Sequence, residues 1–135
     1  MLVRSAKAIV LDPDGYVLIV RRSKTHPFVP LTNDLPGGKV EEGETMLEGL
    51  SRELDEEINI DISNVSVKKV SHDYVENYYG KNHEVELYEV LLPVRPEIVL
   101  GFEHDLFTWL PIKEAKIVGK LYENMFNTHK YSSLV

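Results

Sequence analysis

Glu53, Glu56 and Glu57 lie three and four positions apart in one short stretch of the chain. If that stretch is helical, this spacing places the three carboxylates on one face, where they repel each other by roughly 0.2–0.5 kcal/mol per pair. A hard divalent cation relieves such repulsion, and Mg²⁺ typically takes a few carboxylates and leaves its other positions to water and phosphates. The cluster therefore indicates phosphate chemistry. For three glutamates alone, a solvated acidic face is the commoner explanation.

The surrounding sequence predicts the helix that these carboxylates require, from Thr45 to Ile58. Thr45 and Glu48 have the spacing of a capping box, in which each side chain satisfies a free N–H at the start of a helix. Asn59 follows the last turn, where a residue in the left-handed region is expected. An apolar stripe with helical spacing would face the core, formed by Leu47, Leu50, Leu54 and Ile58.

Acidic residues are concentrated around this helix. The chain has 15 basic and 22 acidic residues and a net charge of −7, which disfavours binding to a nucleic-acid polymer. Nine of the acids lie in one segment of 21 positions: Glu41, Glu42, Glu44, Glu48, Glu53, Asp55, Glu56, Glu57 and Asp61. This local excess favours a cation-binding role over a general surface property.

From Gly38 the sequence reads GKVEEGETMLEGLSRELDEEINI. It closely resembles the signature of the Nudix hydrolase family, G-x5-E-x7-R-E-U-x-E-E-x-G-U, where U is aliphatic. The one departure is Asn59, which stands where the family has glycine. Asparagine tolerates the left-handed backbone better than other non-glycine residues, so the turn is expected to be kept. The segments GYVLIVRRS, LPGGKVEEGE and 103–111 extend the resemblance over most of the chain.

The resemblance implies a metal site and a reaction. In the family, metal ligands match the Gly38 carbonyl and the carboxylates of Glu53, Glu56 and Glu57. The expected cofactor is Mg²⁺, with Mn²⁺ as an alternative. The implied reaction is attack by water on a phosphorus atom of a diphosphate, with a carboxylate removing a proton from the water.

Other positions of the signature carry different implied roles. The family pairs the glutamate matching Glu44 with the arginine matching Arg52, so these two residues are expected to be structural. Family members differ in the general base, which comes from the signature in some and from a later loop in others. Glu53, Glu57 and the loop residue Glu103 are the candidates here. Glu103 could equally be an ordinary exposed acid.

Residues that contact substrate are harder to find from the sequence. Arg22 and Lys39 flank the expected cleft and are candidates for phosphate binding, although surface charge explains them equally well. Tyr78 could stack on a base and Asn127 could hydrogen-bond a base edge, but core or hairpin packing is as good an explanation. The same alternatives apply to Phe28, Tyr74, Tyr79 and Asn124. The histidines show no metal-ligand spacing and receive no catalytic role: His26, His72, His83, His104 and His129.

Element order predicts an α/β (α+β) fold, a Nudix-like mixed β-sheet sandwiched between helices, with residues 1–135 forming a single domain. Strands are expected at 5–11, 16–20, 65–75, 84–94 and 106–110, with a loop over 23–33. Pro111 would open a last helical region at 112–129, with its inner face made of Ile117, Leu121, Met125 and Phe126.

Composition excludes several kinds of site and suggests where the protein is located. The chain lacks cysteine, which excludes disulfides, thiolate metal sites and the isopentenyl-diphosphate isomerase relatives that need a catalytic cysteine. The start of the chain lacks the uninterrupted apolar run of a signal peptide, and no stretch is apolar enough to cross a bilayer, so we expect a cytoplasmic protein that does not bind membranes. It would be a monomer or a homodimer.

The expected partner is a small nucleotide. Because of its short length and compact fold, the chain most resembles the branch of the family that hydrolyses (deoxy)nucleoside triphosphates to the monophosphate and pyrophosphate. The alternatives are a dinucleoside polyphosphate or nucleotide-sugar hydrolase, or a non-catalytic nucleotide-binding module. Modules of that last kind usually lose the signature glutamates, which this chain keeps.

Overall fold

The computed structural model describes residues 2–132, with side chains up to residue 130. Its elements follow in the order β1 (Leu2–Leu11), β2 (Tyr16–Arg22), β3 (Asn33–Asp34), β4 (Gly37–Lys39), α1 (Met46–Ile58), β5 (Ser66–Tyr78), β6 (Lys81–Leu91), β7 (His104–Pro111) and α2 (Glu123–Ser132). Neither helix in this part of the chain has the length and apolar character needed to cross a membrane.

The strands form one mixed sheet, as predicted. Its main path runs β3-β2-β1-β6-β5, with β4 added to β1 and β7 added to β2. β1 and β6 are parallel over their whole length, and the other pairs are antiparallel. β5 and β6 form a long hairpin, in which Tyr79 and Gly80 take positive φ angles of 49° and 77° at the turn.

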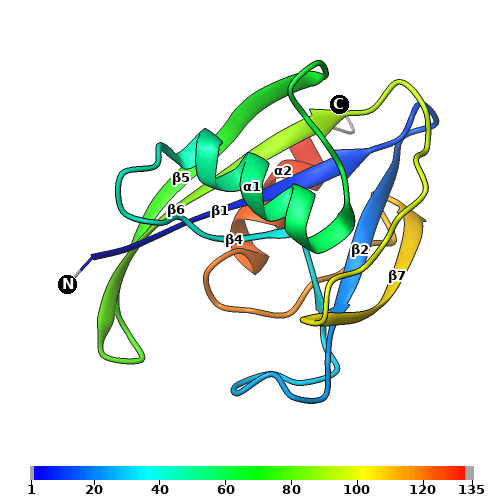
Figure 1. The fold of residues 1–135 in the computed structure, drawn as a ribbon. Helices are drawn as coiled ribbons and strands as arrows, with labels where there is room; N and C mark the ends of the chain where they lie inside the picture. The colour runs from blue at the N-terminus through cyan, green and yellow to red at the C-terminus, as the bar shows by residue number, and fades with distance from the viewer. Residues whose placement is uncertain (1, 133–135) are drawn as a thin grey trace.

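The two helices cover opposite faces of the sheet (Figure 1). Alternate residues of β1 point to opposite sides, so Ala8 and Val10 pack under α1 while Ile9 packs with Phe126 of α2. Each face therefore has its own apolar core. This arrangement confirms the predicted sheet between helices.

The capping signals of α1 are realised as predicted. Thr45 accepts a hydrogen bond from the Glu48 backbone N–H at 3.1 Å, and the Glu48 side chain accepts one from Thr45 N–H at 2.8 Å. Asn59 takes the left-handed conformation at φ 58° and replaces the family's glycine without loss of the turn. The apolar stripe was wrong at Leu47, which is 45% exposed. Val40 packs beneath the first turns, against Gly49.

A divergence of β1 and β2 creates space for a site. β1 pairs with β2 only near the hairpin, at Leu11 and Val17. Further along, β4 takes the place beside β1, with Gly37 opposite Lys7. Gly37 must be glycine there, because its φ is 128° and a Cβ would lie 2.3 Å from the Ala6 carbonyl oxygen. No strand was predicted at these residues.

The last helical region was predicted too long. Residues 112–122 form turns and irregular structure, and α2 begins at Glu123. Gly119 has a φ of 148°, which breaks a helix, and the Val118 N–H is used by the Asn33 carbonyl instead. The expected inner residues Ile117, Met125 and Phe126 are nevertheless buried in the core under α2.

Candidate active site

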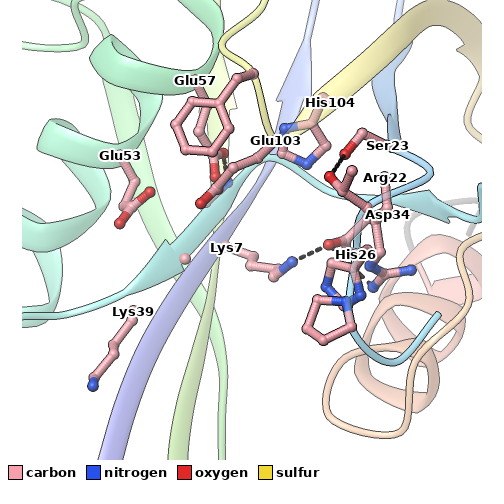
Figure 2. A pocket seen from close by; sticks show the side chains of 15 residues that line it. Lys7, Arg22, Ser23, His26, Asp34, Lys39, Glu53, Glu57, Glu103 and His104 are labelled. Atoms are coloured by element: carbon pink, nitrogen blue, oxygen red, sulfur yellow. Dashed lines mark hydrogen bonds and ion pairs between the residues drawn. The ribbon is translucent and has the colours of Figure 1, made fainter. Parts of the chain in front are cut away.

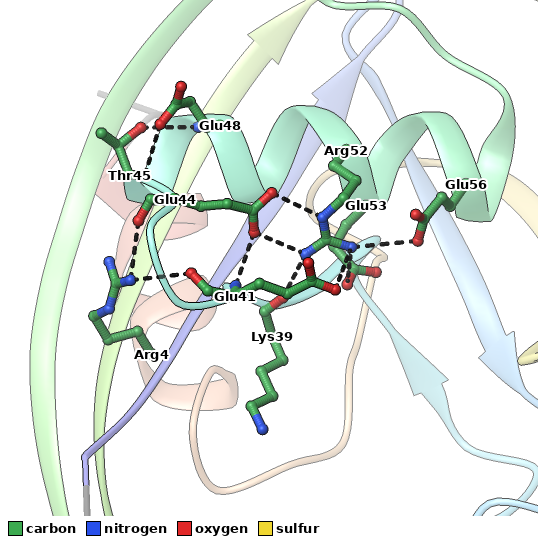
Figure 3. A network of polar contacts seen from close by, with 9 residues as sticks. All are labelled: Arg4, Lys39, Glu41, Glu44, Thr45, Glu48, Arg52, Glu53 and Glu56. Carbon is green, nitrogen blue, oxygen red and sulfur yellow. Dashed lines mark hydrogen bonds and ion pairs between the residues drawn. The ribbon is translucent and has the colours of Figure 1, made fainter.

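Arg52 ties the start of α1 to the preceding loop (Figure 3). Its Nε and Nη2 donate to the two carboxylate oxygens of Glu44 at 2.8 and 3.0 Å, and Nη2 also donates to the Lys39 carbonyl at 3.0 Å. A bidentate pair of this kind fixes geometry as well as charge. Arg52 therefore holds the end of β4, at Lys39, and the following loop, at Glu44, against the helix.

The same guanidinium lies between two of the signature glutamates. Arg52 Nη1 donates to Glu53 at 3.1 Å and to Glu56 at 3.3 Å. The two carboxylates differ in their surroundings, since the side chain of Glu53 is only 14% exposed and that of Glu56 is 59% exposed. Burial raises the pKa of Glu53, and Arg52 counteracts this effect. Glu53 lines the pocket described below, and Glu56 does not.

Glu57 is the buried member of the three. It accepts a hydrogen bond from the Gly37 N–H at 2.9 Å, and burial raises its pKa well above the usual value for a glutamate. Lys7 on β1 opposes that shift by its positive charge. The hydrogen bond from Gly37 and the charge of Lys7 offset only part of the free energy needed to bury the charged carboxylate. A bound cation would stabilise the charged form of Glu57.

Two backbone hydrogen bonds fix the loop that contains Glu103 close to Glu57. The Gly101 N–H donates to the Glu57 carbonyl at 2.8 Å, which fixes the loop to the end of α1. The Ser23 N–H donates to the Glu103 carbonyl at 3.0 Å. The pairing of β2 with β7 contains a bulge between Arg21 and Arg22, next to the first residue of β7. Bulges are frequent beside active sites.

Glu53, Glu57 and Glu103 line one pocket of about 420 Å³ (Figure 2). Its other wall carries Lys7 and Arg22, both paired with Asp34. A group of carboxylates facing a group of cations suits a ligand that binds a metal ion at one end and presents anionic oxygens to the other.

The two predicted phosphate-binding cations, Arg22 and Lys39, both line this pocket but differ in how many protein partners their charged groups have. Arg22 is 8% exposed and donates to Thr32 at 2.7 Å and to the Asn33 carbonyl at 3.2 Å, in addition to its pair with Asp34. It therefore holds the wall together. Lys39 is exposed, and its ammonium has no protein partner among residues 2–132. Its charge is available to a ligand.

A second pocket of about 250 Å³ adjoins the first and shares Lys7, Arg22 and Lys39 with it. Tyr78 lines this second pocket, as does Phe28, which stacks on Tyr79 with ring centroids 4.4 Å apart. The predicted aromatic residues of the hairpin thus meet the loop after β2. Asn124 and Asn127 line neither pocket, and Tyr74 lies apart, bonded to Glu84 at 3.1 Å.

Sequence reasoning missed several residues of the first pocket, among them Lys7, Asp34 and His104. Lys7 gave a usable signal, because a lysine inside the apolar run of β1 is unusual in a strand with both faces covered. Asp34 gave none, since it stands in a segment rich in turn-forming residues. His104 was assigned no role, and burial lowers its pKa to about 4, so the imidazole is neutral at pH 7.

His72 also departs from expectation. Cross-strand pairing brings it beside Glu84 and Glu86, with candidate ligand atoms within 4.8 Å of one another. Spacing along the chain does not reveal such a group. His72 Nε2 lies 2.8 Å from Glu84, and Lys69 approaches Glu86 at 3.5 Å, so both carboxylates already have a protein partner.

The residues of the first pocket fit a hard divalent cation. All the candidate ligands are oxygens, as Mg²⁺ requires. A Cβ on Gly38 would lie 3.0 Å from the Glu53 carboxylate, which shows how closely this backbone approaches that side chain. The buried charge of Glu57 and the repulsion between Glu53 and its neighbours both favour a bound cation.

Comparison with known proteins agrees with the family resemblance and the fold. The NUDIX domain model matches residues 1–131. An uncharacterised Nudix hydrolase of Nostoc sp. (strain PCC 7120) is 34% identical over 137 residues, covering 90% of this chain and 80% of the relative. The chain belongs to the Nudix hydrolase family, whose members are pyrophosphohydrolases that typically use a divalent metal ion.

Solved structures show the same fold at lower identity. A MutT protein from Methanosarcina mazei Go1 matches with a TM-score of 0.82 and 22% identity, covering 98% of this chain and 95% of that one. The dihydroneopterin triphosphate pyrophosphohydrolase of E. coli matches with a TM-score of 0.78 and 20% identity, covering 96% and 95%. These likenesses confirm an α/β fold of a mixed sheet with two helices.

Proposed function

We propose that this Nudix pyrophosphohydrolase cleaves a (deoxy)nucleoside triphosphate into the monophosphate and pyrophosphate. The observation that carries the proposal is the convergence of Glu53, Glu57 and Glu103 in one pocket, opposite Lys7 and beside the free ammonium of Lys39. The adjoining aromatic pocket suits a base, with Tyr78 as a stacking residue. The similar E. coli structure is that of an enzyme named for a triphosphate substrate.

In this proposal the metal site consists of Glu53, Glu56, Glu57 and the Gly38 carbonyl. Mg²⁺ bound there supplies neutralisation of the phosphate oxygens and acidification of water. Glu53 and Glu56 both contact Arg52 Nη1, so the two carboxylates are already neighbours of one positive charge. Metal binding would relieve Arg52 of these two contacts and leave its bidentate pair with Glu44.

In this proposal, residues of the chain position the substrate's phosphates and remove a proton from the attacking water. Lys39 and Lys7 lie where anionic oxygens of a polyphosphate would meet positive charge. Glu103, on a loop fixed to the end of α1 by Gly101, is our candidate for the base that takes the proton from water. Glu53 and Glu57 remain alternatives for that step.

The test is a panel of nucleotides incubated with the protein and Mg²⁺ in ¹⁸O-labelled water. The panel contains (deoxy)nucleoside triphosphates, a dinucleoside polyphosphate and a nucleotide sugar. We expect a nucleoside triphosphate to be the best substrate and to yield monophosphate and pyrophosphate, with the label showing which phosphorus was attacked. A strong preference for a dinucleoside polyphosphate would overturn the substrate assignment but keep the reaction class. Absence of turnover on every diphosphate would favour the nucleotide-binding module.

A further inference from the structure

His104 is a buried polar side chain for which the described part of the chain supplies no side-chain hydrogen bond. It is 8% exposed and lines the pocket that contains Glu53 and Glu57. Its Nδ1 is buried with no partner, and no hydrogen bond to its Nε2 occurs among the described residues either. Burying a polar group in this way costs roughly 1–3 kcal/mol, so such a group in a native structure calls for an explanation.

The environment assigns the position of the imidazole proton. A neutral imidazole carries one proton, on either nitrogen. Nδ1 is sealed from water and faces no acceptor, and orphaned buried N–H groups are rarer than under-satisfied acceptors. The proton is therefore assigned to Nε2, on the side of the ring open to the pocket. His104 then presents an N–H donor to that space.

The surroundings of His104 match an anionic acceptor. Figure 2 shows its ring between Glu103 and Arg22, on the same side of the pocket as the Lys7–Asp34 ion pair. His104 lines the pocket of the carboxylates and not the aromatic pocket that contains Tyr78. Its contact is thus with the phosphate end of a ligand, not with the base.

We propose that His104 binds the substrate directly, as a neutral donor from Nε2–H to a non-bridging oxygen of the diphosphate. This inference rests on the proposed function for the identity of the ligand. The role also explains why the protein makes no hydrogen bond to the ring. A protein acceptor at Nε2 would compete with the substrate oxygen, and a buried donor left free in the resting protein is satisfied when substrate arrives.

The test measures binding with a non-hydrolysable nucleoside 5′-(α,β-methylene)triphosphate in the presence of Mg²⁺. Replacement His104→Phe keeps a ring of similar shape and removes both nitrogens. We expect the dissociation constant to rise about tenfold, the value of one hydrogen bond to a charged oxygen. His104→Gln, which keeps an amide donor, should recover part of the loss. The control is His72→Phe, which removes a histidine outside both pockets and should bind as the wild type does.

A second measurement does not depend on any variant. NMR of the ¹⁵N-histidine-labelled protein should show the Nε2–H tautomer for His104 and a shift of that resonance when the analogue is added. Binding by His104→Phe at wild-type affinity, a protonated Nδ1, or failure of the wild type to bind the analogue would each overturn the inference. If the analogue binds as expected but no diphosphate is hydrolysed, the proposed reaction fails while the role of His104 in binding stands.

Discussion

At the scale of single residues, the three signature glutamates occupy different environments although they are close in sequence. Glu57 is buried, Glu53 is mostly buried in the pocket wall and Glu56 is largely exposed. Arg52 links the last two by one nitrogen atom. The residues therefore should not respond equally to substitution, because Glu53 and Glu57 line the pocket and Glu56 does not.

Removing a pocket carboxylate should reduce turnover far more than stability. We expect Glu53→Gln and Glu103→Gln to lower kcat by about 10²–10⁴-fold, the usual contribution of a general base or metal ligand. The measurement is pyrophosphate release at saturating nucleotide. Asp55→Asn is the matched control, because Asp55 lies exposed on the same helix and lines a different pocket. Equal activity of Glu53→Gln and Asp55→Asn would contradict the role of Glu53.

Glu57 should also make the metal-free protein sensitive to pH. Its folded-state pKa is raised by burial, so the folded protein holds the proton more tightly than the unfolded chain does. The stability from the protonated carboxyl is complete below the unfolded value near 4.5 and is lost as pH rises through the folded pKa. In EDTA, Glu57→Gln should remove this loss and raise the free energy of unfolding at pH 7 by about 1 kcal/mol. Denaturant unfolding at pH 5 and pH 7 measures both effects, and a destabilised variant at pH 7 would refute the assignment.

At the scale of elements, β4 and the start of α1 position the site. β4 lies against β1 in the space that opens where β2 diverges, and Arg52 fixes the loop after β4 to the helix. Gly37 and Gly38 have different reasons to be glycine. A Cβ on Gly37 would meet the backbone of β1, whereas a Cβ on Gly38 would meet only the carboxylate of Glu53.

The two glycines should therefore separate folding from metal binding. Gly37→Ala should cost about 3 kcal/mol of stability, because alanine is strained at φ 128° and cannot avoid the Ala6 carbonyl. Gly38→Ala should fold with a cost below about 1 kcal/mol, since the Glu53 side chain can move aside, but it should weaken Mg²⁺ binding. Thermal unfolding and isothermal titration with Mg²⁺ measure the two effects. Equal destabilisation by both variants would contradict the packing described for Gly37.

The elements that could be predicted were those specified by local rules. The capping box of Thr45, the left-handed Asn59 and the helical spacing of Glu53 to Glu57 all act within a few residues, and the structure shows each of them. β4 has only three residues and pairs with β1, which is distant in sequence, so no local sequence pattern predicts it. In the stretch 112–122 the predicted core residue Ile117 is buried as expected. The backbone there is not helical, because Gly119 has a positive φ and the Val118 N–H donates to the Asn33 carbonyl.

Much of the site depends on contacts distant in sequence. Lys7, Asp34 and His104 come from β1, β3 and β7 and meet only when the sheet has formed. Their residue types are common on protein surfaces, so residue type alone does not mark them as pocket residues. The signature glutamates were found because one helix presents them together. On the opposite wall Arg22 was predicted, whereas Lys7 and Asp34 were not.

At the scale of the whole molecule, the acidic pocket should couple metal binding to stability. A ligand that binds only the folded state stabilises it by about 2.7 kcal/mol at a hundredfold excess over its dissociation constant. For a chain of 135 residues this corresponds to a rise in Tm of about 10 °C. We expect Mg²⁺ to produce such a rise in the wild type and in Asp55→Asn. Glu57→Gln should show little or none, and an undiminished rise in that variant would place the cation elsewhere.

The central claim is that the carboxylates of Glu53 and Glu57, beside the Gly38 carbonyl, hold a hard cation against a diphosphate. The most direct test is a crystal structure with Mn²⁺ and the non-hydrolysable triphosphate analogue, in which anomalous scattering locates the metal. We predict a manganese peak within coordinating distance of both carboxylates and of a phosphate oxygen. A peak only at another place, such as the group of His72, Glu84 and Glu86, or no peak in the pocket while the analogue is bound, would contradict it.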